Sequence, residues 1–463
     1  MTQRLSRADT IGLGLMTFAF FLGAGNIIFP PLEGQLAGSN VLYAMFGFLI
    51  TAVGLPLVSI IAVARVGGGL PSMTTDLPKG TGTFAAVLLF IIIGPAFATP
   101  RTGLVAYEMA IKPLLGSYDI TVSQLYLPAL NITLDRTQAI MTTLFFVITL
   151  MFSWSRGKLI DNIGKILTPA LFLLLICLAI GVVVAPQGEI AAPAESYREM
   201  AFTKGFIGGY NTMDTFAALM FGMLLVDVLR GKGVTEQSAT YKYLVIAGFI
   251  AAAGLAFVYI SLFWLGATSS TVAPDAANGG VVLAAYVQAL FGQPGQWILS
   301  WVVMLACLTT AVGLVSACAD YFSKLTPLSY RQWVVVLCII CAVVANVGLS
   351  QLIALSVPVL LALYPLTIAL VALTFIRPWL PNPKYAFRTV MFVALIFSLL
   401  DGIRGIEALH SVSWIKSILD SQTEYMPLAN QGMAWVLPTA IIMVLVFLIP
   451  ASKKAPSKEA YSS

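Results

Sequence analysis

The stretch FFLGAGNIIFPP (residues 20–31) puts a polar, glycine-rich break inside an apolar segment that covers residues 11–36. A second break, GGYNTMD (residues 208–214), interrupts the apolar segment of residues 202–228. Inside a membrane, backbone can leave the helical hydrogen-bond pattern only where protein or a water-filled cavity satisfies its freed groups. Paired breaks at corresponding positions of two halves therefore indicate a binding site in an inverted-repeat transporter fold.

The composition assigns the chain to the membrane. Of its 463 residues, 59% are hydrophobic and 10% are charged, with a mean hydropathy of +0.93, whereas ordinary soluble chains carry about 25% charged residues. The five cysteines lie in apolar segments without metal-type spacing, which favours small buried side chains over disulfides or zinc ligands. The lipid bilayer is the predicted partner, and the first apolar segment is predicted to remain as a span.

An apolar helix needs roughly 20 residues to cross a hydrocarbon core about 30 Å thick. Twelve segments qualify, and the short apolar run of residues 281–290 suits an extracellular helix or a re-entrant segment. We therefore predict an all-α polytopic membrane protein with about 12 transmembrane helices, of which helices 1 and 6 are broken. The predicted spans cover residues 11–36, 41–64, 84–115, 139–152, 166–184, 202–228, 243–266, 297–321, 333–347, 352–375, 388–404 and 434–449.

Basic residues predict the orientation of these spans. With a cytoplasmic N-terminus, 18 of the 25 Lys and Arg residues lie in cytoplasmic loops and tails, six lie in outside loops, and Arg101 lies within the third span. This asymmetry predicts that both termini are cytoplasmic. No basic block is interleaved with aromatic residues, so the net charge of +5 reflects orientation rather than nucleic-acid binding.

No catalytic constellation is apparent. The single histidine, His410, is predicted near an outside loop, which excludes a histidine triad or a histidine-rich metal site within the helix bundle. The chain has no GxxxxGK[ST] motif, and Gly67-Gly68-Gly69 lies in a predicted loop without a preceding strand. The sequence therefore predicts a protein that is not an enzyme and has no cofactor, and whose transport, if active, draws on an ion gradient.

The first break offers groups for both ends of a zwitterion. The N–H groups of Ala24, Gly25 and Asn26 lie at the positive end of the second half-helix, which suits a carboxylate. The carbonyls of Phe21 and Leu22 suit a sodium ion or a substrate ammonium. The second break adds carbonyls at Tyr210, Asn211 and Thr212. The alternative is that these small residues only allow close helix packing, but two breaks five spans apart favour the binding site.

Two further features of the spans bear on function. Thr309 and Thr310 lie deep in the eighth span; their hydroxyls either return to their own backbone, which is the commoner arrangement, or serve as hard oxygen ligands for a small monovalent cation. Ionisable residues inside a membrane are functional candidates because they are costly to insert. Arg101 and Glu108 are seven residues apart, a spacing typical of a mutual structural pair, so Asp214 beside the second break is the stronger candidate for substrate binding.

Several motifs of the chain resemble those of one family, the bacterial branched-chain amino-acid:cation symporters of the BrnQ type. The resemblance covers nearly the whole chain, and it places the chain within the wider LeuT-like transporter superfamily, whose first-span GxGN break is similar to residues 23–26. The motifs are MTFAFFLGAGNIIFPP (residues 16–31), GPAFATPRT (94–102), TMDTFAALMFG (212–222), LTTAVGLVSACADYF (308–322) and SVPVLLALYP (356–365).

The resemblance implies a fold, a function and a location. The fold is a LeuT-like inverted repeat, with a first five-helix repeat in residues 1–190, a second in residues 191–376, and two additional helices with a cytoplasmic tail in residues 377–463. The function is sodium-coupled import of leucine, isoleucine and valine by alternating access. The location is the bacterial inner membrane.

The wider superfamily also implies particular site residues. A sodium ion would be bound by the carbonyls of Ala19, Leu22 and Ala306 together with the hydroxyls of Thr309 and Thr310. A substrate-contacting tyrosine on the third span would correspond to Tyr107. Asp214 departs from the superfamily pattern, so its role does not follow from the resemblance.

Two other function classes remain open at this point. One is a proton-coupled transporter or exchanger of other small amines on the same fold, which would depend on titration of Asp214. The other is a channel, which would not need a closed pocket for a zwitterion.

Overall fold

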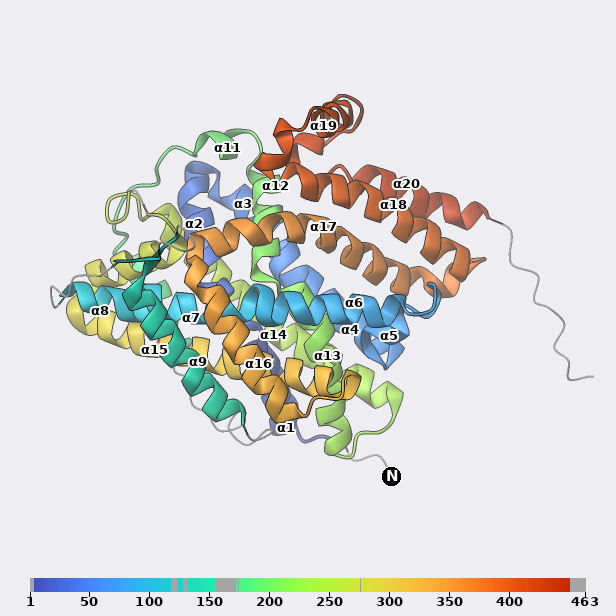
Figure 1. Cartoon of the computed structure of the whole chain (residues 1–463), viewed down its shortest axis with the longest axis horizontal. Coiled ribbons are helices and arrows are strands. Elements are labelled where there is room, and N and C mark those ends of the chain that lie inside the picture. Colours follow the sequence, from blue (N-terminus) through green and yellow to red (C-terminus); the bar gives the residue numbers. More distant parts are fainter. Residues whose placement is uncertain are drawn as a thin grey trace, which may run out of the picture. The chain divides into compact units, whose positions relative to one another are not determined.

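The computed structural model describes residues 4–117, 124–127, 132–154, 172–173, 175–274 and 276–449 (Figure 1). The chain forms two compact units: one contains Met1–Gly69 and Ala85–Val357, and the other contains Leu70–Phe84 and Pro358–Ser463. Both sequence breaks lie in the first unit. The predicted division at residues 190 and 376 concerns repeats rather than compact units and stays a prediction.

Helices make up almost all of the described chain. In chain order they are α1 (Arg7–Phe21), α2 (Ala24–Ala37), α3 (Val41–Leu49), α4 (Leu55–Val66), α5 (Gly69–Met73), α6 (Thr81–Ile91), α7 (Ala98–Ala106), α8 (Lys112–Ser117), α9 (Arg136–Ser153), α11 (Glu195–Arg198), α12 (Ala201–Gly208), α13 (Asp214–Gly231), α14 (Gln237–Ala267), α15 (Gly279–Leu325), α16 (Tyr330–Val344), α17 (Leu349–Ile376), α18 (Pro383–Arg404), α19 (Ser413–Tyr425) and α20 (Val436–Leu445).

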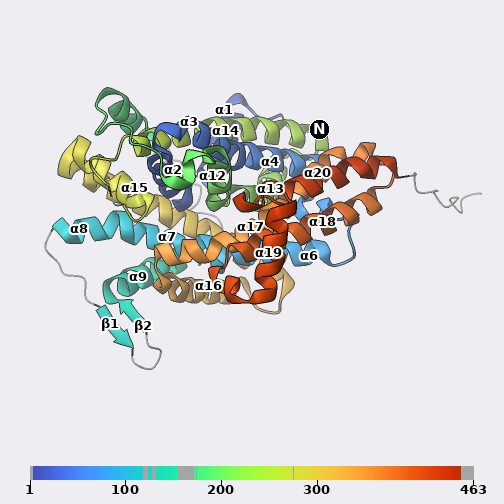
Figure 2. The same cartoon turned by 90° about the horizontal axis from the view of Figure 1, so that it is seen from above.

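One small departure from the all-α prediction is an antiparallel hairpin of β1 (Gln124–Leu127) and β2 (Ile132–Asp135), which precedes α9 (Figure 2). The predicted short helix at residues 281–290 forms the first part of α15, and the kink at Gly292 (φ 62°, ψ −157°) separates it from the predicted eighth span.

Nine helical stretches among the described residues are long and apolar enough to cross a membrane. One of them, Ala24–Val66, joins the second half of the predicted first span to the second span. Shorter apolar helices at Leu175–Val184 and Val436–Leu448 coincide with the predicted fifth and twelfth spans, but residues 166–171 and 174 of the predicted fifth span lie outside the described residues. The count of 12 therefore stays a prediction.

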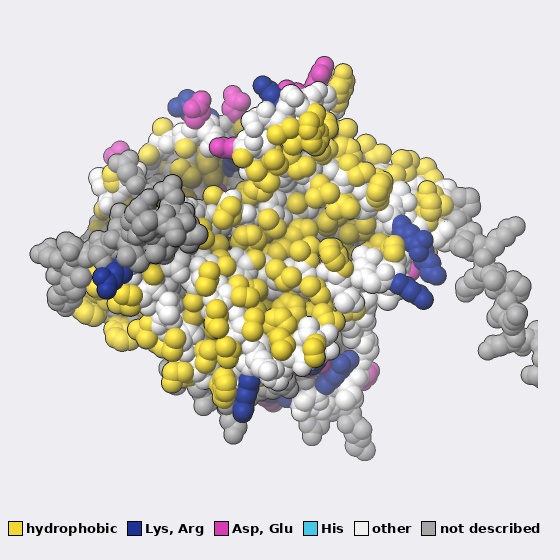
Figure 3. Space-filling model, in the orientation of Figure 1, with side chains coloured by type: hydrophobic (Ala, Val, Ile, Leu, Met, Phe, Trp, Pro, Cys, Tyr) yellow, Lys and Arg dark blue, Asp and Glu magenta, His cyan; other side chains and the backbone are white. Residues whose placement is uncertain are grey.

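The surface matches a lipid environment. Figure 3 shows a face that is mostly hydrophobic, with Lys, Arg, Asp and Glu side chains along its margins. Elsewhere on the surface, Leu42, Tyr43 and Phe46 of α3 are each at least 61% exposed. A soluble monomer rarely exposes contiguous apolar patches of this kind, so these side chains are placed to face acyl chains.

The first break is short and sharply defined. Helix α1 ends at Phe21, Leu22 (φ −72°, ψ 82°) and Gly23 (φ −109°, ψ −173°) leave the helical conformation, and α2 begins at Ala24. The Asn26 side chain caps the new helix by accepting a hydrogen bond from the Gly23 N–H at 3.0 Å. The predicted polar stretch of residues 23–26 is therefore one extended residue followed by the first turn of α2.

The second break is longer. Helix α12 ends at Gly208, a 3-10 turn follows at Gly209–Thr212, and Met213 adopts a left-handed conformation (φ 61°, ψ 15°) before α13 begins at Asp214. A non-glycine residue in this region is uncommon and signals local strain that the surrounding structure must hold in place. The structure thus confirms that both helices are broken where the sequence predicts.

Glycines outside the breaks let helices cross closely. A Cβ at Gly266 of α14 would stand 2.0 Å from the Pro31 carbonyl oxygen of α2, and one at Gly205 of α12 would stand 1.9 Å from the Ala44 carbonyl oxygen of α3. The small-residue packing interpretation therefore applies at these crossings. Because α14 packs against both α1 and α2, it brings its polar side chains to the first break.

The third span is also interrupted. Between α6 and α7 lies a π-helical turn, η3 (Ile92–Ala96), in which Gly94 departs from helical geometry (ψ −113°) and Pro95 follows. The Thr99 hydroxyl bridges the kink by donating to the Ile93 carbonyl at 3.1 Å. A π-bulge often marks a functional site, and here it redirects the start of α7, which carries Arg101.

The C-terminal end of α2 is tied to the segment before α12. The Ala194 N–H donates to the Leu36 carbonyl at 2.9 Å, and the Tyr197 hydroxyl donates to the Glu33 carboxylate at 2.6 Å. Burial, together with the charge of Glu33, raises the pKa of Tyr197 above its usual range, so its hydroxyl stays protonated as a donor. These contacts fix the second half of the first span.

The second unit has its own polar contacts. The Asp401 carboxylate of α18 accepts from the Trp435 backbone N–H at 3.3 Å and from the Gln422 side chain of α19 at 3.4 Å. Arg377 pairs with Asp76 at 2.6 Å. Helix α19 was not among the predicted spans; its 13 residues are too few to cross a bilayer.

Candidate functional site

A small cavity lies between the two breaks. Seven of the predicted site residues line it: Phe21, Ala24, Gly25, Asn26, Thr212, Asp214 and Thr310. Further lining residues are Phe20, Gly23, Ile93, Ala98, Arg101, Thr102, Met213, Ala217, Phe221 and Leu314. The third span thus contributes to the site alongside the first, sixth and eighth.

The first turn of α2, with Ala24, Gly25 and Asn26, lines the cavity. Helix N-termini carry about half a positive charge and leave N–H donors without partners in the helix. The Asn26 N–H already donates to the Gly23 carbonyl at 3.2 Å. Of the three predicted N–H donors, those of Ala24 and Gly25 therefore remain candidates for a substrate carboxylate. Asn26 acts in the site through its side chain.

Asn26 takes part in a buried polar network with Asp214 and Tyr259. The Asn26 amide donates to Asp214 Oδ2 at 2.7 Å, and the Tyr259 hydroxyl donates to the same oxygen at 2.6 Å. The Asn26 amide also lies within hydrogen-bond contact of the Tyr259 hydroxyl. All three side chains are at most 2% exposed. A buried carboxylate needs such donors, and they bind the two breaks together through α14.

Sequence reasoning did not identify Tyr259. It lies within α14, a 31-residue apolar helix, and its sequence surroundings carry no break or charge. Only the packing of α14 against α1 and α2 places its hydroxyl beside Asp214.

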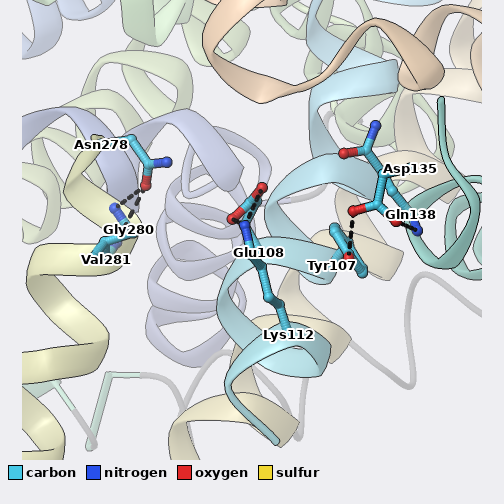
Figure 4. Close-up of polar contacts among 8 residues, drawn as sticks. All are labelled: Tyr107, Glu108, Lys112, Asp135, Gln138, Asn278, Gly280 and Val281. Carbon is cyan, nitrogen blue, oxygen red and sulfur yellow. Dashed lines mark hydrogen bonds and ion pairs between the residues drawn. The ribbon is translucent and has the colours of Figure 1, made fainter. Parts of the chain in front are cut away.

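Arg101 enters the same cavity from α7. Its Nη1 donates to the Asn211 carbonyl of the second break at 2.8 Å, and its Cζ lies 5.1 Å from the centroid of the Phe29 ring. The two residues of the suggested Arg101–Glu108 pair contact other groups. Glu108 instead pairs with Lys112 at 3.0 Å, one helical turn further on (Figure 4), because the kink at Gly94 turns the start of α7 toward the breaks.

Not every predicted substrate residue lines the cavity. The Tyr107 hydroxyl donates to the Asp135 carboxylate at 3.0 Å (Figure 4), and Tyr107 is absent from the residues around the cavity. Tyr210 is buried against Phe206, and its carbonyl accepts from the Met213 N–H at 3.0 Å. The Asn211 carbonyl accepts the hydrogen bond from Arg101. Asn211 therefore acts on the cavity by holding the Arg101 side chain.

Of the predicted sodium ligands, only Thr310 lines the cavity. The Thr309 hydroxyl donates to the Ala306 carbonyl at 2.9 Å and to Leu305 at 3.1 Å, which is the arrangement common in helices. Thr310 lines the cavity, and its Oγ1 lies 3.7 Å from where a Cβ at Gly23 would stand. Ala19 and Leu22 do not line the cavity. Among the described residues, no cluster of His, Cys, Asp and Glu suits a metal ion.

One wall of the cavity is apolar. Phe20 stacks on Phe221 with ring centroids 4.9 Å apart, and the Phe21 ring meets Phe221 edge-on at 6.5 Å. Ile93 and Leu314 add aliphatic surface. The cavity therefore combines a guanidinium and a carboxylate with an apolar wall.

The sequence comparisons with known proteins all indicate the same family. A model of the family described as "Branched-chain amino acid transport protein" matches residues 6–453. The chain is 43% identical, over 97% of each chain, to the branched-chain amino acid permease BrnQ of Escherichia coli K12. It is 44% identical to the branched-chain amino acid transport system 2 carrier protein of Pseudomonas aeruginosa, over 94% of this chain and 95% of that protein.

A solved structure shares the fold. The nucleobase-cation-symport-1 family transporter Mhp1, in a closed conformation with bromovinylhydantoin bound, matches 95% of this chain and 91% of its own chain with a TM-score of 0.59 and 12% identity. This likeness and the two broken helices confirm the predicted helical, LeuT-like fold class.

Proposed function

The chain belongs to the family of branched-chain amino acid transport proteins, and from that membership we propose that it imports leucine, isoleucine and valine together with sodium ions by alternating access. It is a transporter rather than an enzyme. The observation that carries the proposal is the cavity between the two broken helices, where opposite charges and an apolar wall suit an aliphatic zwitterion.

The cavity offers a complementary group for each part of the substrate. The substrate carboxylate would bind at the amides of Ala24 and Gly25, and its ammonium near Asp214 and the carbonyls of Phe21 and the second break. The aliphatic side chain would pack on Phe221 and its neighbours. Burial of a leucine side chain is worth about 1.5–3 kcal/mol, which favours leucine over alanine but does not separate leucine from isoleucine, since these differ in shape rather than in size.

Sodium would couple the first span to the eighth. The proposed ligands are the carbonyls of Ala19, Leu22 and Ala306 and the hydroxyls of Thr309 and Thr310. The position of Thr310 beside Gly23 supports this proposal, because it brings an oxygen ligand next to the break. For Thr309 to bind the ion, its hydroxyl must turn away from the Ala306 carbonyl.

Replacing both threonines by valine tests the sodium site. Thr309→Val with Thr310→Val removes two oxygen ligands at nearly constant shape, so the sodium concentration for half-maximal leucine uptake should rise roughly tenfold or more, as expected for lost charged contacts. Leucine affinity at saturating sodium should change far less. Thr367→Val on α17, where the hydroxyl bonds its own helix, is the matched control. An unchanged sodium requirement would exclude these hydroxyls as ligands.

A second candidate coupling ion is the proton. Asp214 is a buried carboxylate with two hydrogen-bond donors in the middle of the site, and a group of this kind can carry a proton between two states of a transporter. On this account the substrate would include other small amines, and uptake would not require sodium.

The proposed location is the bacterial inner membrane with both termini in the cytoplasm, supported by the distribution of basic residues. The test of the proposed function is uptake of radiolabelled leucine into proteoliposomes with an imposed sodium gradient. Accumulation that isoleucine and valine inhibit, and that collapses without the sodium gradient, is the expected result. Equal accumulation from a proton gradient without sodium would support the second candidate instead.

A further inference from the structure

Arg101 is a buried charge whose position depends on the interruption of the helix before α7. The π-helical turn at Ile92–Ala96 and the kink at Gly94 redirect α7, so that Arg101, one turn into the helix, reaches the second break. Its side chain is 4% exposed. A charge in this position is costly unless it is paired and hydrogen-bonded. Arg101 lines the cavity between the breaks, so a ligand bound there lies close to this positive charge.

Two positive elements converge beside Gly25. Arg101 Nη2 lies 2.7 Å, and its Cζ 3.1 Å, from where a Cβ of Gly25 would stand. The Gly25 amide belongs to the first turn of α2, which carries the positive end of the helix dipole. An anion bound beside Gly25 would therefore meet both the guanidinium and the first-turn N–H groups of α2.

The residues that line the cavity carry one positive and one negative charge. At each break the C-terminal end of one half-helix faces the N-terminal end of the next, so their partial charges of about one half largely offset each other. Among the residues that line the cavity, this leaves the positive charge of Arg101 and the negative charge of Asp214. Asn26 and Tyr259 hold the Asp214 carboxylate in place.

We propose that Arg101 binds the substrate carboxylate together with the first-turn amides of α2, and that it makes the cavity selective for a free α-carboxylate. This inference rests on the proposed function and names the residue that recognises one end of the substrate. A guanidinium matches a carboxylate with two parallel hydrogen bonds. Its Nη1 is anchored on Asn211 of the second break, so carboxylate binding at Arg101 joins the first break to the second.

The test compares leucine with leucinamide, which keeps the ammonium and the aliphatic chain but has no carboxylate. Both ligands are measured by equilibrium binding to the purified protein at saturating sodium, at a pH at least one unit below the α-amino pKa of about 8. In Arg101→Gln, leucine affinity should fall roughly 10- to 100-fold, as expected for a lost charged hydrogen bond, while leucinamide affinity stays the same or rises. The ratio of the two affinities should therefore fall at least about tenfold.

The outcomes separate the inference from the proposed function. Wild-type protein that does not bind leucine contradicts the proposed function. Wild-type binding with equal losses of leucine and leucinamide in Arg101→Gln contradicts the inference, because a purely structural arginine would weaken both ligands. Arg230→Gln, at an exposed pair with Asp227 on the cytoplasmic end of α13, is the control and should leave both affinities unchanged.

A second variant keeps the test decisive if Arg101→Gln does not fold. Arg101→Lys keeps the positive charge but not the planar pair of donors. The leucine-to-leucinamide affinity ratio should then fall by roughly threefold or more. A ratio equal to that of the wild type in a folded Arg101→Lys protein overturns the inference.

Discussion

Leucine uptake is abolished in Gly25→Leu on this account, while the protein still inserts into the membrane. A Cβ at this position would stand 2.7 Å from Arg101 Nη2 and 3.5 Å from the Asn211 carbonyl oxygen. Contacts under 3.0 Å cannot persist, so the guanidinium must leave its place beside the break, and the larger leucine side chain fills the space between α2 and Arg101. Gly25 is thus needed for two reasons. Arg101 and Asn211 leave no room for a side chain, and the substrate carboxylate must come close to the backbone.

Uptake of radiolabelled leucine in proteoliposomes checks this prediction. The matched control is Gly12→Leu on α1, where an added Cβ meets nothing within 4 Å. That variant should transport leucine like the wild type. Wild-type leucine affinity in Gly25→Leu would show that the substrate does not approach the first turn of α2.

Asp214→Asn should impair leucine uptake by at least about tenfold and leave the residual uptake dependent on sodium. The substitution keeps the size of the side chain but removes the charge that receives hydrogen bonds from Asn26 and Tyr259. Hydrogen bonds to a charged group are worth about 1.5–3 kcal/mol, and the substrate ammonium loses its counter-charge. The proposed sodium ligands belong to other residues, so the ion dependence is retained.

The measurement is uptake against an imposed pH gradient, with and without sodium, in the wild type and in Asp214→Asn. Asp227→Asn, at an exposed pair on the same helix, is the control and should behave like the wild type. If the wild type accumulates leucine from a proton gradient without sodium and Asp214→Asn does not, then Asp214 is the proton carrier and the sodium proposal is wrong.

The breaks were predictable from the sequence because polar and glycine residues stand out against long apolar runs. FFLGAGN and GGYNTMD lie where the structure interrupts α1–α2 and α12–α13. The extent of the first break was less predictable. Gly23 leaves the helical conformation, while Ala24 and Gly25 already belong to the next helix, and this depends on how Asn26 caps it.

The partners of buried polar groups were not predictable. Arg101 meets Asn211, 110 residues away, and Tyr259 meets Asp214, 45 residues away. Helical spacing favoured Glu108 for Arg101, but such spacing describes neighbours on one straight helix. The π-helical turn before α7 changes which face points to the cavity, and sequence periodicity does not record that turn.

The two threonines of the proposed sodium site have different surroundings in the structure. Adjacent threonines on the eighth span predict an ion site only if their hydroxyls face the first break. Thr310 lies at the cavity, whereas the Thr309 hydroxyl bonds its own helix. The site therefore stays a prediction that the valine substitutions test.

The central claim is that leucine occupies the cavity between the two breaks, and cysteine protection tests it most directly. Ala217→Cys places a thiol on the cavity wall in a background where Cys177, the exposed cysteine, is replaced by alanine. Leucine with sodium should slow labelling of this thiol by a small thiol reagent by roughly tenfold at saturating ligand, and lysine should not. Labelling that leucine leaves unchanged, in protein that still transports leucine, would place the substrate elsewhere and contradict the account.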